Sequence, residues 1–299
     1  MTDPKLGAAA EWQAGGHSYS CWDNDIFYRD DGEGDAVLCL HGFPTSSWDW
    51  RKLWPELTRN YRAIAPDMIG LGFSAKPFHY HYGIFDYADL CEDLLLHLGV
   101  NRVHLLAHNF GATVTQELLA RLQERQRYGE NGLEIRSVCF LNSGIVPEAS
   151  ELRVELRLLL EQKGRDFARL FNEAGFAQSL MVLFGRDNRP SAEELASYWQ
   201  LGTMNGGLRI ADKLVHFIAD RRKHRGRWLN ATREAQIPVS HFNGTQDPVC
   251  GLNMVAKVRE LLPNVRIELC DRSGHFPHLE TPQELWSYYR AFLAALSPR

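Results

Sequence analysis

The chain has 299 residues, 44% hydrophobic and 23% charged, enough for one large α/β domain or a domain with an insertion. Its net charge of −4 argues against nucleic acid or an anionic membrane as the main partner. No apolar run approaches membrane-spanning length, and the N-terminus lacks the basic start and apolar core of a secretion signal. We therefore expect a cytoplasmic protein whose residues 1–16 form a flexible leader.

Short apolar runs alternate with longer segments of helical periodicity. This alternation predicts an α/β fold with a doubly wound, mostly parallel sheet. An antiparallel hairpin, 17–22 and 25–30, is expected at one edge. The other strands are expected at 36–42, 61–67, 103–109, 135–144, 238–244 and 265–271, with helices at 46–57, 85–99, 111–125, 252–262 and 281–296.

One segment interrupts the rhythm. From 147 to 234 the sequence shows helical patterns and no convincing strand. A helical block between two strands of one sheet is typical of an inserted lid. We divide the chain into a first core part (1–146), a helical cap (147–234) and a second core part (235–299).

The cysteines are expected to be free thiols. Cys39, Cys139 and Cys270 sit in apolar, strand-like runs, where reduced cysteine behaves as a small hydrophobe. No CxxC pair or Cys/His cluster indicates zinc. The pair His79 and His81 lacks further ligands and is interpreted as part of a loop. We expect no metal and no cofactor.

The segment LLAHNFG (105–111) has the form of a nucleophile elbow: an apolar strand, then a small-x-nucleophile-x-small turn, then a helix. The third position of that pentapeptide carries the attacking atom. Here it is Asn109, whose amide is a poor nucleophile.

An acid and a histidine follow the late strands. Asp247 stands in GTQDPV and His275 in DRSGHFPHLE, so the order is nucleophile position, acid, histidine, as in α/β-hydrolases. His275 is expected to act as general base, with Asp247 holding its ring. His278 is nearby, but the place of His275 soon after the last strand favours it.

Two backbone N–H groups are expected to form an oxyanion hole: that of Phe110, after the elbow residue, and that of Phe43 in HGFP. His41 and His108 are interpreted as packing and loop-anchoring residues.

Several motifs together resemble one family. HGFPTSSWDW, DMIGLGFS, AHNFG followed by ATVTQELLAR, DPV and SGHFPHLETP resemble the epoxide hydrolase and haloalkane dehalogenase branch of the α/β-hydrolases, most of all the mesoderm-specific transcript proteins, whose elbow reads HDYG. The resemblance covers about residues 36–296. It implies an aspartate at the elbow that attacks an electrophilic carbon, forming an ester that a histidine-activated water hydrolyses.

Asn109 departs from that pattern at the attacking atom. An Asp→Asn change keeps the shape and removes the charge, the usual way to stop such an enzyme while keeping its pocket. We favour an inactivating, engineered change from aspartate over a natural asparagine. A change from serine is a third possibility, since HSFG elbows exist.

The resemblance also bears on the substrate. Haloalkane dehalogenases hold the leaving halide with an Asn and a Trp at the positions of Phe43 and Phe110, which offer no side-chain N–H. Epoxide hydrolases generally use two lid tyrosines to protonate the epoxide oxygen. This lid contains only Tyr198, beside Trp199. Tyr198 is either that acid or a packed helix residue, and we place Trp199 in the substrate pocket.

Two functions of different classes remain. One is a hydrolase that forms an aspartyl ester, acting on a small apolar organic substrate such as an epoxide, with Asn109 disabling it; a dehalogenase or esterase would share the fold. The other is a non-catalytic protein with a natural Asn109 that binds a ligand or partner. The basic run 221–227 is interpreted as a solvated helix end.

Overall fold

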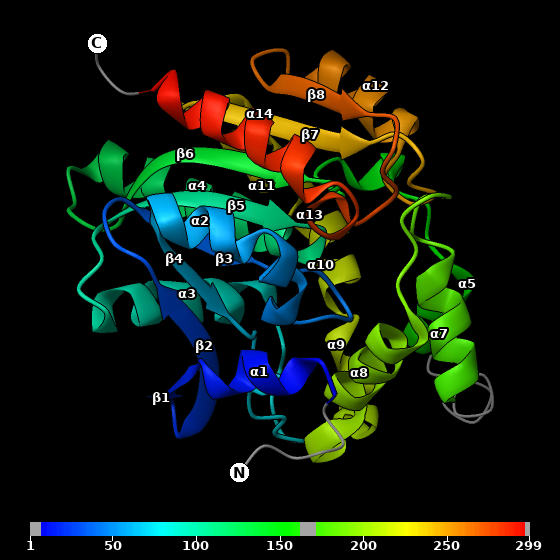
Figure 1. The fold of residues 1–299 in the computed structure, drawn as a ribbon. Helices are drawn as coiled ribbons and strands as arrows, with labels where there is room; N and C mark the ends of the chain where they lie inside the picture. Colours follow the sequence, from blue (N-terminus) through cyan, green and yellow to red (C-terminus); the bar gives the residue numbers. More distant parts are fainter. Residues whose placement is uncertain (1–6, 162–171, 297–299) are drawn as a thin grey trace.

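The computed structural model describes residues 7–161 and 172–296. Its centre is an eight-stranded sheet with the order β1-β2-β4-β3-β5-β6-β7-β8 (Figure 1). The β1-β2 and β2-β4 pairs are antiparallel, and all the other neighbouring strands run parallel. The expected doubly wound, mostly parallel sheet with an edge hairpin is confirmed. The strands are β1 His17–Cys21, β2 Asn24–Asp31, β3 Ala36–Leu40, β4 Arg62–Pro66, β5 Arg102–His108, β6 Glu134–Leu141, β7 Val239–Gly244 and β8 Arg266–Cys270.

The central strands are buried on both faces because helices cover both sides of the sheet. Along β3, Leu38 and Leu40 pack in one apolar cluster while Val37 and Cys39 pack in the other, as the two-residue period of a strand requires. One cluster includes α3 Ile84–His97, α4 Phe110–Tyr128 and α12 Leu252–Leu261. The other includes η2 Ser47–Lys52, α2 Trp54–Asn60, α13 Pro277–Glu280 and α14 Pro282–Ala294.

The N-terminal segment corrects one expectation. Residues 9–14 are not a flexible leader, because they form helix α1 (Ala9–Ala14). Trp12 is 5% exposed, its ring packs edge-on against Trp54 at 5.0 Å, and its Nε1 donates to Ser47 Oγ at 3.0 Å. One aromatic side chain therefore attaches the segment to the core. Residues 1–6 lie outside the described part.

Between β6 and β7 the described residues form helices and no strand, as expected for 147–234. Most of them lie beside the sheet at one end of the molecule (Figure 1). The last of these helices, Arg225–Arg233, packs along α4, where Trp228 Nε1 donates to Glu117 at 2.8 Å. It therefore joins the helices that cover that face of the sheet. The helices are η3 Pro147–Ala149, α5 Val154–Leu160, α7 Glu173–Met181, α8 Ala192–Thr203, η4 Met204–Ile210, α9 Ala211–Leu214, α10 Phe217–Lys223 and α11 Arg225–Arg233.

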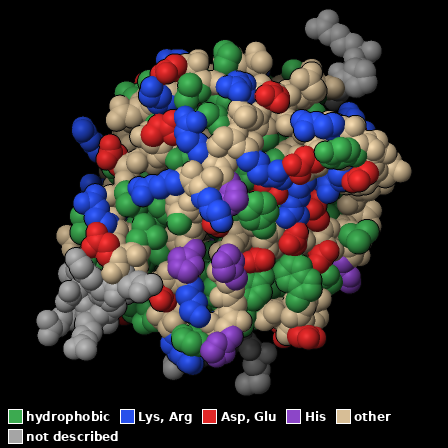
Figure 2. All heavy atoms as spheres, turned by 180° about the vertical axis from the view of Figure 1, so that it is seen from behind, with side chains coloured by type: hydrophobic (Ala, Val, Ile, Leu, Met, Phe, Trp, Pro, Cys, Tyr) green, Lys and Arg blue, Asp and Glu red, His purple; other side chains and the backbone are tan. Residues whose placement is uncertain are grey.

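The basic run 221–227 is not a uniformly solvated helix end. Arg227 pairs with Glu117 and Glu124, and Arg225 pairs with Glu148, while Arg221 is buried. Acidic and basic side chains are mixed over the face seen in Figure 2, consistent with the small net charge. No helix of the described residues is both long and apolar enough to cross a membrane.

A buried polar network attaches helix α8 to the core. Tyr198 Oη donates to Asp49 Oδ1 at 2.8 Å and accepts from Arg51 Nη1 at 3.0 Å. Arg51 also pairs with Glu194, and the Thr45 hydroxyl donates to Asp49. Asp49 and Tyr198 are buried and both have partners here, so removal of one leaves the other short of a hydrogen bond away from water.

Replacement of Tyr198 with phenylalanine should lower the free energy of unfolding by about 1–3 kcal/mol, because Asp49 loses a buried donor. Urea unfolding followed by circular dichroism measures this. Tyr128→Phe removes a hydroxyl from an exposed tyrosine and should change the stability little. Equal stability of Tyr198→Phe and the parent would show that the network does not hold α8.

Candidate active site

Asn109 lies directly after β5 and before α4, at the edge where the carboxyl ends of the parallel strands meet. Its backbone has φ 48° and ψ −103°. A non-glycine residue with positive φ is uncommon, and such strain is typical of functional sites. The turn is the sharp strand-to-helix elbow that the sequence predicts, and it places the Asn109 side chain above the sheet edge.

Gly111 explains why the elbow needs a small residue at its last position. A Cβ there would lie 2.5 Å from the carbonyl oxygen of Leu40, and the Gly111 N–H donates to the His41 carbonyl at 3.1 Å. The start of α4 therefore lies directly against the end of β3, which sets the position of Asn109.

The structure brings the three predicted residues into one line of hydrogen bonds. Asn109 Nδ2 lies 2.9 Å from His275 Nε2, and His275 Nδ1 lies 2.7 Å from Asp247 Oδ2. Because a carboxylate only accepts, Nδ1 carries the proton and Nε2 presents its lone pair to the Asn109 amide. This arrangement is the one expected of a general base oriented by an acid.

Asp247 is held ionised despite its burial. Burial alone would raise its pKa, but the neighbouring His275 and hydrogen bonds from His275, Val249 N–H and Asn142 outweigh it, so the pKa lies below its ordinary value. Asn142 Nδ2 donates to Oδ2 at 2.8 Å and Val249 N–H to Oδ1 at 2.7 Å. Nothing in the sequence marks Asn142 as part of the site, because an asparagine after a strand carries no distinctive signal.

The loop that carries His275 is fixed by neighbours on several elements. The His275 N–H donates to the Leu183 carbonyl, and the His275 carbonyl lies 2.8 Å from His108 Nε2. Burial drives the pKa of His108 well below its ordinary value, so the ring is neutral and its Nε2–H donates. The anchoring role expected for His108 agrees with this contact.

Glu280 adds a second support to the same loop. It accepts the N–H groups of Gly274 at 2.8 Å and Phe276 at 2.9 Å, on either side of His275, and that of Gly185 at 2.6 Å. Gly185 follows α7, so a single carboxylate joins the cap to the His275 loop.

One of the two expected oxyanion donors points to the amide oxygen of Asn109. The Phe43 N–H points to Asn109 Oδ1 at 3.5 Å. Phe110 is the first residue of α4, where N–H groups have no partner within the helix. The N–H groups of Phe43 and Phe110 stay proposed donors. The amide oxygen of Asn109 faces the loop that carries Phe43.

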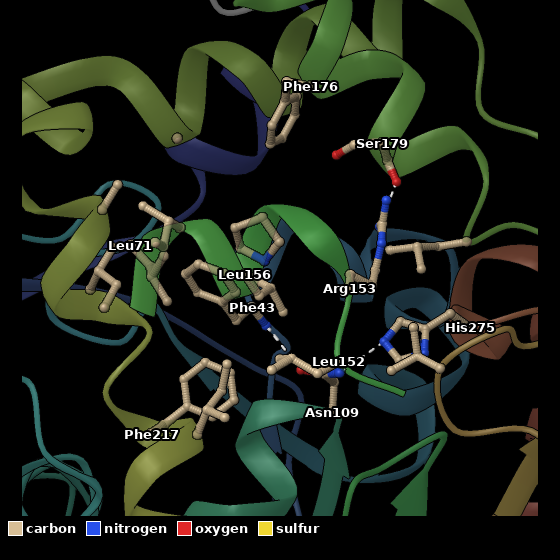
Figure 3. Close-up of a pocket in the computed structure, with 18 of the residues that line it drawn as sticks. Phe43, Leu71, Asn109, Leu152, Arg153, Leu156, Phe176, Ser179, Phe217 and His275 are labelled. Atoms are coloured by element: carbon tan, nitrogen blue, oxygen red, sulfur yellow. Dashed lines mark hydrogen bonds between the residues drawn. The ribbon is translucent and has the colours of Figure 1, made fainter. Parts of the chain in front are cut away.

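A cavity opens above Asn109 and His275, between the sheet edge and the cap. Figure 3 shows the Asn109 amide at its floor, directed toward His275, with Phe43 and Leu152 beside it. Trp199 lines the cavity, and its contact with a substrate stays a prediction. Most of the other lining side chains are apolar: Phe43, Leu71, Leu152, Leu156, Leu159, Phe176, Leu183, Leu214, Phe217 and Ile218.

Tyr198 does not line this cavity. It is buried in the network with Asp49 and Arg51 described above, so of its two expected roles the structure supports the packed helix residue and not the acid. Sequence alone could not separate adjacent positions of one helix, since Trp199 faces the cavity and Tyr198 faces the core.

Three buried side chains below the His275 loop could in principle ligate a metal. Potential ligand atoms of Asp49, His108 and His278 lie within 4.8 Å of one another. Asp49 already accepts hydroxyls from Tyr198 and Thr45, and His108 is engaged by the His275 carbonyl. We interpret the group as a polar support of the His275 loop.

Solved structures with the same architecture include two enzymes. CorEH, an epoxide hydrolase, has a TM-score of 0.73 and 21% identity, covering 94% of this chain and 99% of that one. The haloalkane dehalogenase DbeA of Bradyrhizobium elkani has a TM-score of 0.78 and 22% identity, covering 94% and 98%. At these identities the likeness establishes the fold.

Similar sequences span almost the whole chain. The mesoderm-specific transcript homolog protein of Bos taurus is 37% identical over 303 residues, covering 97% of this chain and 89% of its own. A putative hydrolase of Mycobacterium tuberculosis, LipZ, is 32% identical and covers 99% of both chains. The pattern that describes the α/β hydrolase fold matches residues 35–282. The chain belongs to the α/β hydrolase fold family.

Proposed function

We propose that this protein is the disabled form of a hydrolase that works through an aspartyl ester, with an apolar epoxide as its substrate. The observation that carries the proposal is the hydrogen-bonded line from Asn109 through His275 to Asp247 at the floor of an apolar cavity. This line supplies the base and the acid that orients it, and it lacks a nucleophilic atom at position 109.

An aspartate at position 109 would supply that atom. One carboxylate oxygen would take the place of Oδ1, near the Phe43 N–H, and the other the place of Nδ2, open to the cavity. The latter attacks an epoxide carbon, the carbon–oxygen bond breaks, and an ester forms. Since Tyr198 lies outside the cavity, we assign the proton taken up by the opening oxygen to a water molecule there.

Hydrolysis of the ester then uses His275. Its Nε2 removes a proton from a water molecule that attacks the ester carbon of residue 109, and Asp247 stabilises the resulting imidazolium. Negative charge develops on the oxygen that faces Phe43, where the N–H groups of Phe43 and Phe110 stabilise it. The bond between the carbonyl carbon of residue 109 and the substrate oxygen then breaks, the imidazolium returns its proton to that oxygen, and the diol leaves. The acid proton left on residue 109 neutralises the hydroxide formed when water protonated the opening epoxide, which restores the carboxylate.

Asparagine stops this sequence for two reasons. Its Nδ2 has no lone pair available for attack, and its N–H occupies the lone pair of His275 Nε2 that would activate water. The pocket itself keeps its shape, because the amide is nearly isosteric with a carboxylate.

A non-catalytic binding protein is the second candidate. It is favoured by the fact that both ends of the Asn109 amide have partners, in His275 and the Phe43 N–H, so the asparagine suits the resting structure. The native gene separates the two: an aspartate codon at position 109 supports the enzyme.

Our first functional prediction is that Asn109→Asp converts apolar epoxides to diols at least roughly a thousandfold faster than the parent, since it restores the nucleophile. Incubation with a panel of epoxides, followed by chromatography of the diols, measures it. No turnover by the folded variant with any of these epoxides would refute the epoxide assignment.

Adding Tyr198→Phe to that variant serves as the control for the lid acid. Because Tyr198 does not reach the cavity, the double variant should retain the turnover number of Asn109→Asp. A large loss of turnover in a folded protein would restore Tyr198 as the acid.

Little halide release is the second functional prediction. Phe43 and Phe110 offer no side-chain N–H to a leaving halide, so Asn109→Asp should liberate chloride or bromide from haloalkanes far more slowly than it opens epoxides. An ion-selective electrode follows the halide. Rapid bromide release would move this protein to the dehalogenases.

The roles of residues 109 and 275 separate in a double variant. Asn109→Asp with His275→Gln should still attack but fail to hydrolyse the ester. Intact mass after mixing with an epoxide should show a covalent adduct, which digestion places on the peptide 103–121. The unaltered protein should gain no mass. An adduct on a serine or cysteine would mean that the nucleophile is misassigned.

A further inference from the structure

A buried cation lies beside the elbow and has no part in the steps above. Arg221 is 9% exposed and lines the same cavity as Asn109 and His275. It follows Phe217 and Ile218 on the buried face of α10, a position at which an apolar residue is normally found.

Two of the guanidinium nitrogens are fixed by the elbow itself. Nη2 donates to the backbone carbonyl of Asn109 at 2.8 Å, and Nε donates to Thr113 Oγ1 at 2.6 Å. The group also lies over the ring of Phe217, with Cζ 4.8 Å from the ring centroid. The guanidinium is therefore held rigidly, and one of its anchors is the backbone of the residue at the nucleophile position.

The third nitrogen, Nη1, lies where Gly144 leaves room for it. A Cβ on Gly144 would be 2.8 Å from Nη1. The hydrogen bonds given above use the Nε–H and one N–H of Nη2. Both N–H groups of Nη1 and the second N–H of Nη2 are therefore left for a ligand in the cavity.

No carboxylate in residues 7–161 or 172–296 pairs with Arg221. Burial lowers the pKa of its guanidinium to about 10, which still leaves the group charged at neutral pH. A buried, unpaired charge costs stability and persists only where something compensates it. An anionic ligand would supply that compensation.

We propose that Arg221 binds a carboxylate on the substrate, so that the substrate is an apolar molecule with an acidic group close to its reacting carbon. The proposal rests on the proposed function, because it concerns the same cavity. The planar fork of arginine matches a carboxylate, and the apolar lining accommodates the remainder of the molecule.

The other charged groups of the cavity do not offer an equivalent site. Arg153 donates to the Ser179 carbonyl at 2.6 Å (Figure 3), and Arg222 and Glu151 are exposed, so water screens their charges. Arg221 is the buried cation of this lining among the described residues.

The test uses the protein as it is, with Asn109 in place, and measures binding of octanoate and of its neutral counterpart octanamide by titration calorimetry. Octanoate should bind at least about tenfold more tightly, because charge-assisted hydrogen bonds form only with the anion. Arg221→Gln should abolish that preference. Lys223→Gln, which removes an exposed charge from the same helix, should retain it.

Several results would overturn the proposal: equal affinities for the two ligands, no octanoate binding at millimolar concentration, or a preference that persists in folded Arg221→Gln. If Arg221→Gln does not fold, Arg221→Lys decides. A lysine keeps the charge without the fork, so it should weaken octanoate binding and leave octanamide binding unchanged. Unchanged octanoate binding there would also contradict the proposal.

The binding measurement needs no turnover, so its result does not depend on whether the proposed function is correct. A carboxylate preference without epoxide hydrolysis by Asn109→Asp would keep the Arg221 site and remove the epoxide assignment. Hydrolysis of neutral epoxides, combined with equal binding of octanoate and octanamide, would keep the epoxide assignment and remove the Arg221 site.

Discussion

The hydrogen bond between the Asn109 amide and His275 Nε2 joins elements that are 166 residues apart in the chain. It exists because the parallel strands β5 and β8 end at the same edge of the sheet, and because the strained elbow directs residue 109 outward there. The His108 ring, the Leu183 carbonyl and the Glu280 carboxylate then fix the backbone of the His275 loop. The geometry of the candidate site is thus a consequence of sheet topology, reinforced by a few buried polar contacts.

Charge is distributed unevenly in this site. Asp247 is held ionised by hydrogen bonds and by His275, whereas burial favours the neutral forms of His108 and His278. An aspartate at position 109 would add a negative charge at the floor of the cavity, next to His275, where the neutral amide of Asn109 adds none.

Much of the fold was predictable from the sequence, because apolar runs and helical periodicity report burial directly. The order of elbow, acid and histidine likewise predicted which side chains would meet. Three features were not predictable, each for a physical reason. The segment around Trp12 has the composition of a flexible leader, yet Trp12 packs into the core. The orientation of Tyr198 depends on the packing of α8 against η2. Arg221 belongs to a run of basic residues that reads as solvated, and only the placement of α10 beside the cavity shows that it is buried.

In the proposed ester mechanism, oxygen passes to the substrate from residue 109 and not directly from water. A single turnover of Asn109→Asp in ¹⁸O-labelled water, with enzyme in excess over an epoxide, tests it. The account predicts a diol that contains only unlabelled oxygen and a 103–121 peptide that gains one ¹⁸O atom. A labelled diol from the first turnover, with an unlabelled peptide, would show that water attacks the epoxide itself and would contradict the ester mechanism.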